Sequence, residues 1–176
     1  LVSYLTLPPG ADADRNGRPE QSVPLVLLVH GGPWGRDGYG YNSMHQWLAN
    51  RGYGVLSVNF RGSTGFGKNF IRAADKEWAG RMHDDLIDAV DWAVAEHIAP
   101  KDKIAIMGGS YGGYATLVGL TFTPEVFACG VDIVGPANLQ TLLSTIPPYW
   151  QAVRAKFARA IGDLETEEGR TLLRER

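Results

Sequence analysis

One serine in this chain lies between two pairs of glycines. The stretch IMGGSYGGY, residues 106–114, places Ser110 after the apolar run 103–108 and at the start of the helix-like segment 110–122. The glycines two residues before and two residues after it complete the pattern G-x-S-x-G. In that pattern the serine occupies a tight, strained turn between a strand and a helix, and its hydroxyl projects above the sheet. The alternative is a glycine-rich turn without chemistry.

Three other apolar runs of strand length, 23–30, 53–60 and 126–135, alternate with segments of helical spacing such as 81–97. A continuous apolar run is typical of a strand that is buried on both faces. Alternating strands and helices predict the α/β class, here a three-layer, mostly parallel sheet with helices on both faces. We expect Cys129, in the last run, to be a small buried residue. With 176 residues, 44% of them hydrophobic, the chain can form one domain with a sizeable core.

An earlier apolar run leads directly into a second motif, His-Gly-Gly-Pro at 30–33. Acyl transfer needs two N–H donors aimed at the oxygen on which negative charge develops. One donor is the N–H after the nucleophile, here Tyr111, and the other lies in a loop after an earlier strand. We expect Gly32 N–H to be this second donor, with Gly31 as the second choice. His30 is expected to organise the loop through a hydrogen bond and not to transfer a proton.

With both motifs in this order, the chain resembles an α/β-hydrolase and, more narrowly, the catalytic domain of the prolyl oligopeptidase family of serine peptidases. Within that family it is similar to the acylaminoacyl-peptidase and dipeptidyl-peptidase-like branch. The stretches that carry the resemblance span nearly the whole chain: 3–10, 30–37, 52–70, 81–92, 103–117 and 130–139.

This resemblance implies cleavage of peptides, often short ones, through an acyl-enzyme on Ser110. It implies an N-terminal β-propeller that restricts access to the site. It also implies the oxyanion donors Tyr111 N–H and the N–H of a glycine in the motif at 30–33. Arg61 matches the family's Arg-Gly after the following strand, and we interpret it as a residue that orders its loop.

The histidines do not follow the order that the resemblance implies. In this fold the triad runs serine, acid, histidine along the chain, but all four histidines precede Ser110. Asp132 and Asp163 follow it, and Asp132 falls within a predicted strand. We therefore expect residues 1–176 to be the N-terminal two thirds of an α/β-hydrolase catalytic domain, without its C-terminal part and without a propeller. We expect little or no peptidase turnover from this chain alone, and an open sheet edge through which two copies could pair.

Composition and charge exclude several classes of partner. A formal net charge of −2 provides no basic surface for nucleic acid or an anionic membrane. No apolar run approaches the roughly 18 residues that span a bilayer. A single cysteine rules out a disulfide framework, and no signal peptide is visible, so a cytoplasmic location is expected although the N-terminus looks truncated. We expect no cofactor and no metal. His83, beside Asp84 and Asp85, is interpreted as part of a solvated helix start.

Other functions stay open. An esterase or lipase of the same fold uses both motifs, and a non-catalytic interaction module would explain the missing histidine. Segment 62–69 nearly matches a phosphate-binding loop, but Asn69 replaces the Ser or Thr that would bind Mg²⁺. Tyr149 and Trp150 follow the fourth buried strand at the edge where α/β sheets bind ligands. They form either a hydrophobic wall for the residue before the scissile bond or ordinary helix packing.

Overall fold

The computed structural model describes residues 1–176, with all side chains except those at positions 148, 151 and 152. One sheet runs through the molecule in the strand order β1-β3-β2-β4-β5. Its strands are β1 (Ser3–Thr6), β2 (Leu25–Val29), β3 (Gly54–Val58), β4 (Ile104–Gly109) and β5 (Cys129–Ile133). Strand β1 runs antiparallel to β3, and the other neighbouring pairs are parallel. The mostly parallel sheet expected from the sequence is confirmed.

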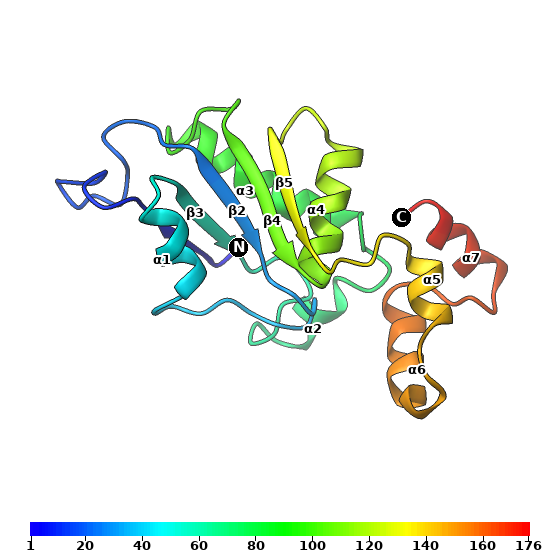
Figure 1. Cartoon of the computed structure of the whole chain (residues 1–176). Helices are drawn as coiled ribbons and strands as arrows, with labels where there is room; N and C mark the ends of the chain where they lie inside the picture. Colours follow the sequence, from blue (N-terminus) through cyan, green and yellow to red (C-terminus); the bar gives the residue numbers. More distant parts are fainter.

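Helices cover both faces of this sheet (Figure 1). On one face α1 (Ser43–Ala49) packs against β3 and β1; on the other, α4 (Tyr111–Phe122) packs against β4 and β5 and contacts α3 (Arg81–Ala95). Beyond β5 the chain continues into a group of helices at one side of the molecule, shown in yellow to red in Figure 1. These are α5 (Leu139–Ser144), the 3₁₀ turn η1 (Pro148–Trp150), α6 (Gln151–Ala160) and α7 (Glu167–Arg174). The short α2 (Lys68–Arg72) follows β3. No helix of the described chain is both long and apolar enough to cross a membrane.

The apolar run of β2 divides between the two faces. Leu25, Leu27 and Val29 join the large core beneath α3 and α4, whereas Val26 joins a smaller cluster with Leu48 of α1. Successive side chains of a strand point to opposite faces, so a strand covered on both sides must be apolar at every position. This explains why the run in the sequence is continuous.

Strand β5 differs from the prediction for 126–135. Cys129, expected to be buried, is exposed, and Val131 and Ile133 are 48% and 43% exposed. In the described chain β5 pairs with β4 alone, and α1 lies over β3 and β1 instead of β5. An apolar run predicts which residues suit a buried strand, but burial also needs neighbours on both sides. The face of β5 opposite α4 is therefore open and apolar.

Candidate active site

The turn that carries Ser110 is a sharp strand-to-helix junction. β4 ends at Gly109 and α4 begins at Tyr111, and Ser110 between them has φ 57° and ψ −116°. Such a positive φ is uncommon for a residue with a side chain and costs on the order of 1–3 kcal/mol. The Ser110 N–H donates to the Ile133 carbonyl at 2.9 Å, and the Ser110 carbonyl accepts from Tyr114 N–H at 3.1 Å. The surrounding structure thus holds an exposed serine in a strained conformation.

The glycines around Ser110 differ in how strictly they are needed. A Cβ placed on Gly108 would lie 2.6 Å from Gly112 Cα, and one on Gly112 would overlap the Val29 carbonyl oxygen. A Cβ on Gly113 would overlap the Asp132 carboxylate. At Gly109, by contrast, the nearest atom would be 3.8 Å away, an ordinary contact. Three of the four glycines are required because the start of α4 lies against β4, the end of β2 and the end of β5.

Tyr111 presents its backbone to the site and its ring to the core. Its N–H lies in the first turn of α4, where no intrahelical acceptor exists. Its ring is buried, 4.6 Å from the Trp78 ring and 5.4 Å from the Phe60 ring between centroids, and its hydroxyl donates to Met82 Sδ at 3.8 Å. Burial raises the pKa of the Tyr111 phenol well above its ordinary value. The phenol therefore stays protonated within the core, and the role predicted for Tyr111 concerns its backbone N–H alone.

The loop after β2 lies directly against the elbow. β2 and β4 pair in parallel with Val29 opposite Gly108, so their carboxyl ends meet at one edge of the sheet. A Cβ placed on Gly31 would lie 3.6 Å from Ser110 Cβ and 3.1 Å from the Gly109 carbonyl oxygen. Gly32 has φ +126°, a conformation that favours glycine. The structure therefore brings together the two motifs that the sequence separates.

A groove of about 280 Å³ runs beside this loop, lined among others by Gly31, Gly109, Ile133 and Asp37. The Asp37 N–H donates to Asn59 Oδ1 at 2.9 Å, which fixes the backbone of this residue. Burial raises the pKa of the Asp37 carboxyl above its ordinary value, and the nearby His30 acts in the opposite direction. On the side of Asp37 the groove is therefore lined by a carboxyl group that is partly shielded from water.

His30 is held on three sides. Its ring stacks on Phe60, with centroids 4.5 Å apart and planes 17° apart. Nδ1 lies 2.8 Å from the Gly31 carbonyl oxygen and Nε2 lies 2.9 Å from Ser63 Oγ. A carbonyl only accepts, so Nδ1–H donates to it, and in the neutral ring Nε2 then accepts from the Ser63 hydroxyl. The loop-organising hydrogen bond predicted for His30 is confirmed. No hydrogen bond joins Ser110 to any of the four histidines, all of whose side chains are described.

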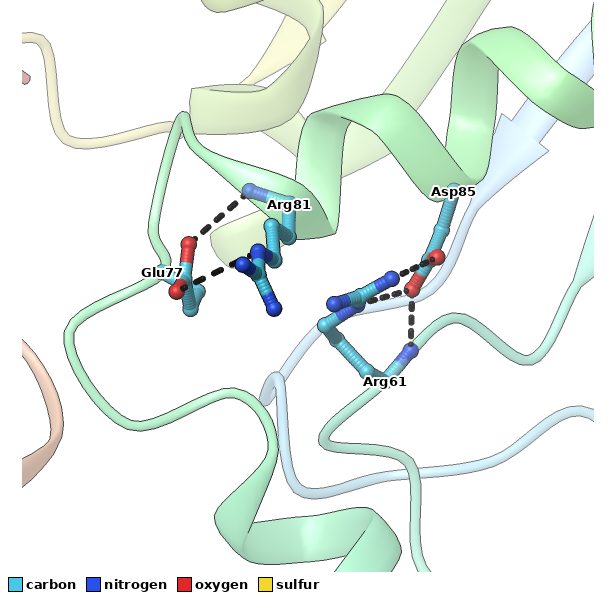
Figure 2. Close-up of polar contacts among 4 residues, drawn as sticks. All are labelled: Arg61, Glu77, Arg81 and Asp85. Atoms are coloured by element: carbon cyan, nitrogen blue, oxygen red, sulfur yellow. Dashed lines mark hydrogen bonds and ion pairs between the residues drawn. The ribbon is translucent and has the colours of Figure 1, made fainter.

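Arg61, just after β3, is fixed by a buried carboxylate on α3 (Figure 2). Its guanidinium donates from Nε to Asp85 Oδ2 at 2.8 Å and from Nη2 to Oδ1 at 2.6 Å, and its N–H donates to Oδ2 at 2.8 Å. The side-chain hydrogen bonds with Asp85 raise the pKa of the Arg61 guanidinium above its ordinary value. The loop-ordering role predicted for Arg61 is confirmed. Figure 2 also shows the looser pair of Arg81 and Glu77, whose charged atoms are 3.9 Å apart.

The interpretation of 83–85 as a solvated helix start is wrong for two of its three residues. Asp85 is buried against Arg61, and His83 is buried with Nε2 3.0 Å from the Thr123 hydroxyl. Burial lowers the pKa of His83. The described residues contain no group of three or more His, Cys, Asp or Glu side chains placed to hold a metal. Asp85 follows Met82 by three positions and precedes Ala89 by four, so it lies on the apolar stripe of the helix. This spacing in the sequence could have predicted that Asp85 is buried.

Segment 62–69, the near match to a phosphate-binding loop, packs on the loop after β2. Thr64 N–H donates to the Gly35 carbonyl at 2.8 Å. The Arg36 guanidinium lies 4.9 Å from the centroid of the Phe66 ring. The segment thus has partners within the chain, in the loop after β2.

Tyr149 and Trp150 lie in η1 and are 83% and 51% exposed. Neither belongs to the core cluster, and neither lines the groove beside the Gly31 loop. The aromatic residue at the loop is Trp34, whose ring stacks on Phe157 of α6 with centroids 5.7 Å apart. Lys156 Nζ lies 3.6 Å from the centroid of the Trp34 ring. Contact of α6 with the loop was not foreseen from the sequence.

The sheet order, the elbow and the loop against it define a hydrolase scaffold of the α/β class. The family model described as the prolyl oligopeptidase family matches residues 39–158. The chain therefore belongs to the prolyl oligopeptidase family.

The names of similar curated proteins agree with membership of this family. The chain is 67% identical to "Dipeptidyl aminopeptidase BIII" of Pseudoxanthomonas mexicana over 176 residues, which are 100% of this chain and 26% of that protein. It is 51% identical over 191 residues to "Dipeptidyl peptidase family member 6" of Caenorhabditis elegans, again 100% of this chain and 26% of that protein. The chain thus spans about a quarter of the length of these curated relatives.

Solved structures give the same fold. A Mycobacterium tuberculosis puromycin-hydrolyzing peptidase matches 97% of this chain with a TM-score of 0.82 and 32% identity, over 25% of its own length. An acylaminoacyl peptidase in complex with Z-Gly-Gly-Phe-chloromethyl ketone matches 97% of this chain with a TM-score of 0.79 and 27% identity, over 26% of its length. The α/β-hydrolase fold expected from the sequence is confirmed.

Proposed function

We propose that Ser110 is the nucleophile of a serine peptidase that cleaves oligopeptides through an acyl-enzyme. The observation that carries the proposal is the placement of this exposed, strained serine at the start of α4 with the His-Gly-Gly-Pro loop against it. Family membership and the names of the relatives support a peptide as the substrate. The length of those relatives supports an additional N-terminal β-propeller in the complete protein.

The chemistry follows from the elbow. Ser110 Oγ attacks the scissile carbonyl carbon, and the negative charge that develops on its oxygen is stabilised by the N–H groups of Tyr111 and Gly32, with Gly31 as the second choice. Donors of this kind, together with the positive end of α4, act mainly on the transition state. Tyr149 and Trp150 remain candidates for a hydrophobic wall around the residue before the scissile bond.

A serine hydroxyl is a weak nucleophile until a base removes its proton. His30 engages both ring nitrogens elsewhere, and no histidine follows Ser110 in these 176 residues. We therefore expect the 176-residue chain by itself to hydrolyse peptides far below normal enzyme rates.

The test compares this chain and the complete gene product that contains it. In the complete product, Ser110→Ala should abolish fluorophosphonate labelling and lower kcat for a peptide p-nitroanilide by about 10⁶-fold. The control Ser144→Ala removes an exposed serine of α5 and should change neither. Retained labelling and turnover in Ser110→Ala would overturn the proposal. Normal turnover by the 176-residue chain would refute the expectation that it lacks its base.

The same assay separates the other candidates. A strong preference for p-nitrophenyl esters over peptide anilides would favour an esterase or lipase. Absence of both labelling and turnover in the complete gene product would favour a non-catalytic interaction module.

A further inference from the structure

We infer that a cavity beside α1, separate from Ser110, binds a small organic ammonium ion. The cavity measures about 580 Å³, a size typical of small-molecule sites, and the Asp37 carboxylate supplies its negative charge. Tyrosine rings at its rim complete the site. Ser110 does not line this cavity, so the inference goes beyond the proposed function and does not depend on it.

Four segments of the chain form the cavity. Strands β1 and β3 are neighbours in the sheet, α1 packs against both, and residues 37–42 of the loop before α1 complete the lining. The groove beside the Gly31 loop shares two residues with the cavity, Asp37 and Asn42. The cavity therefore adjoins that groove, and Asp37 lies at the boundary between them.

The backbone of Asp37 is fixed by one buried side chain. Asn59 accepts from the Asp37 N–H at 2.9 Å and donates from Nδ2 to the Asp37 carbonyl at 3.2 Å. Asn59 is itself held in place, because its N–H donates to the Val2 carbonyl at 3.0 Å. The carboxyl group of Asp37 is thus presented to the cavity from a fixed backbone.

The Asp37 carboxyl group lacks the hydrogen bonds that a buried acid normally has. Its Oδ2 is shielded from water, and no donor within the described part of the chain bonds to it. Burial raises the pKa of this carboxyl, whereas the nearby His30 acts in the opposite direction. A buried carboxylate oxygen without a hydrogen bond is unfavourable, and a cationic donor that enters the cavity would compensate it.

The other walls of the cavity supply no competing positive charge. The described residues that line it include no Lys or Arg, and Asp37 is the one carboxylate among them. His45 is held between two hydroxyl groups, with Nδ1 2.9 Å from Thr6 Oγ1 and Nε2 2.7 Å from Ser57 Oγ. Burial lowers the pKa of His45, which favours the neutral ring. The cavity therefore favours a cation over a phosphate or a carboxylate.

Three tyrosines favour an organic ammonium ion over a metal ion. The rings of Tyr4 and Tyr39 have centroids 6.5 Å apart, and Tyr41 also lines the cavity. Tyr39 and Tyr41 are exposed, so a ligand can reach their rings. An aromatic face attracts an ammonium group. A metal ion would need several oxygen ligands, and the described residues contain no group of three or more His, Cys, Asp or Glu side chains placed for one.

The test measures binding of benzylammonium to the complete gene product by ligand-observed NMR. Benzyl alcohol and benzoate are neutral and anionic probes of similar shape. We expect benzylammonium to bind with a Kd in the millimolar range, and the other two probes to bind at least about tenfold more weakly. Added salt should weaken the binding of benzylammonium, because it screens the attraction to Asp37.

Three variants test whether the binding occurs in this cavity. Asp37→Asn keeps the shape of the side chain and should weaken benzylammonium binding at least about tenfold. Tyr39→Ser removes an exposed ring and should weaken it about threefold. Asp91→Asn, at an exposed carboxylate of α3, is the matched control and should leave binding unchanged. Because Asp37 Oδ2 has no donor to lose within the described chain, Asp37→Asn should also keep the Tm of the parent.

A kinetic measurement identifies the source of the ammonium group. If a cationic group of the peptide substrate supplies it, benzylammonium should raise KM for a peptide anilide without lowering kcat. If the ligand is a separate small molecule, benzylammonium should bind without raising KM.

Three results would overturn the inference. The first is equal binding of the three probes, and the second is equal binding of benzylammonium by the parent and Asp37→Asn. The third is a large fall in Tm for Asp37→Asn, because the carboxylate would then be paired inside the complete protein. The proposed function is tested separately by Ser110→Ala and stands or falls independently of these results.

Discussion

Gly112 shows how one missing side chain allows the elbow to close. The first turn of α4 passes so near the end of β2 that a Cβ on Gly112 would overlap the Val29 carbonyl oxygen. That oxygen belongs to a strand paired on both sides, so it cannot move without disturbing the sheet. Gly109, in contrast, has room for a methyl group although it directly precedes Ser110.

This contrast gives a matched pair of substitutions. Gly112→Ala should lower the free energy of unfolding by about 3 kcal/mol, the upper range for overpacking, and reduce fluorophosphonate labelling of Ser110. Gly109→Ala should change the free energy of unfolding by no more than about 0.5 kcal/mol and keep labelling. Urea unfolding and labelling of the complete gene product measure both effects. Equal destabilisation by the two substitutions would contradict this account of the elbow.

Contiguous motifs made the principal site residues predictable. Ser110 and His30 each carry their signal in the residues beside them, and Arg61 was recognised from its match to the family's Arg-Gly after a strand. Ser63 was missed because its role comes from contact with His30, and nothing in its own neighbourhood in the sequence shows that contact. Whether Tyr111, Gly32 and Gly31 act as donors stays a prediction.

Helix α3 is tied to the loop after β3 by the pair of Arg61 and Asp85. Two guanidinium bonds and one backbone bond converge on a carboxylate whose side chain is 6% exposed. Breaking a buried pair by removing one partner leaves the other charge without compensation. The pair of Arg81, the first residue of α3, and Glu77, which precedes that helix, is longer and more exposed.

Asp85→Asn should therefore lower the free energy of unfolding by about 3 kcal/mol. Arg81→Ala should lower it by less than about 1 kcal/mol, as for exposed ion pairs. Urea titrations of both variants, made in the same protein, provide the comparison. If both variants lost a similar amount of unfolding free energy, burial of Asp85 would contribute little to stability.

The strands and helices were predicted with near-correct bounds because their periodicities differ, but their burial was not always predictable. For β2 the apolar run and the observed burial agree, since helices cover both faces. For β5 they disagree, since burial depends on neighbours that a run of apolar residues does not specify. His83 was misread for the related reason that a polar side chain on an apolar helix face is buried when another helix packs there.

The open face of β5 gives the whole molecule an exposed apolar surface at a strand edge. Val131 and Ile133 are partly exposed, and Val134, just after this strand, is 85% exposed. In the described chain β5 also has an unpaired backbone edge. Unpaired strand edges flanked by apolar side chains favour association with another chain.

We expect the 176-residue chain to self-associate, with a mass above that of the monomer in size-exclusion chromatography with light scattering. Val131→Lys should shift it toward the monomer, because a charge at this position opposes packing of two apolar faces. Tyr41→Lys, at a side chain 85% exposed in the loop before α1, is the control and should leave the mass unchanged. A monodisperse parent monomer would contradict the expectation.

The parallel pairing of β2 with β4 has a further consequence for how the protein folds. These strands are neighbours in the sheet, yet β3 and α3 separate them in the chain. Contacts between such distant segments require closure of a long loop and are slow to form. The Gly31 loop and Ser110 therefore meet only after the central sheet has assembled. In a refolding experiment, reaction of Ser110 with an active-site probe would count the molecules that have completed that step, whereas helix formation would be detected earlier.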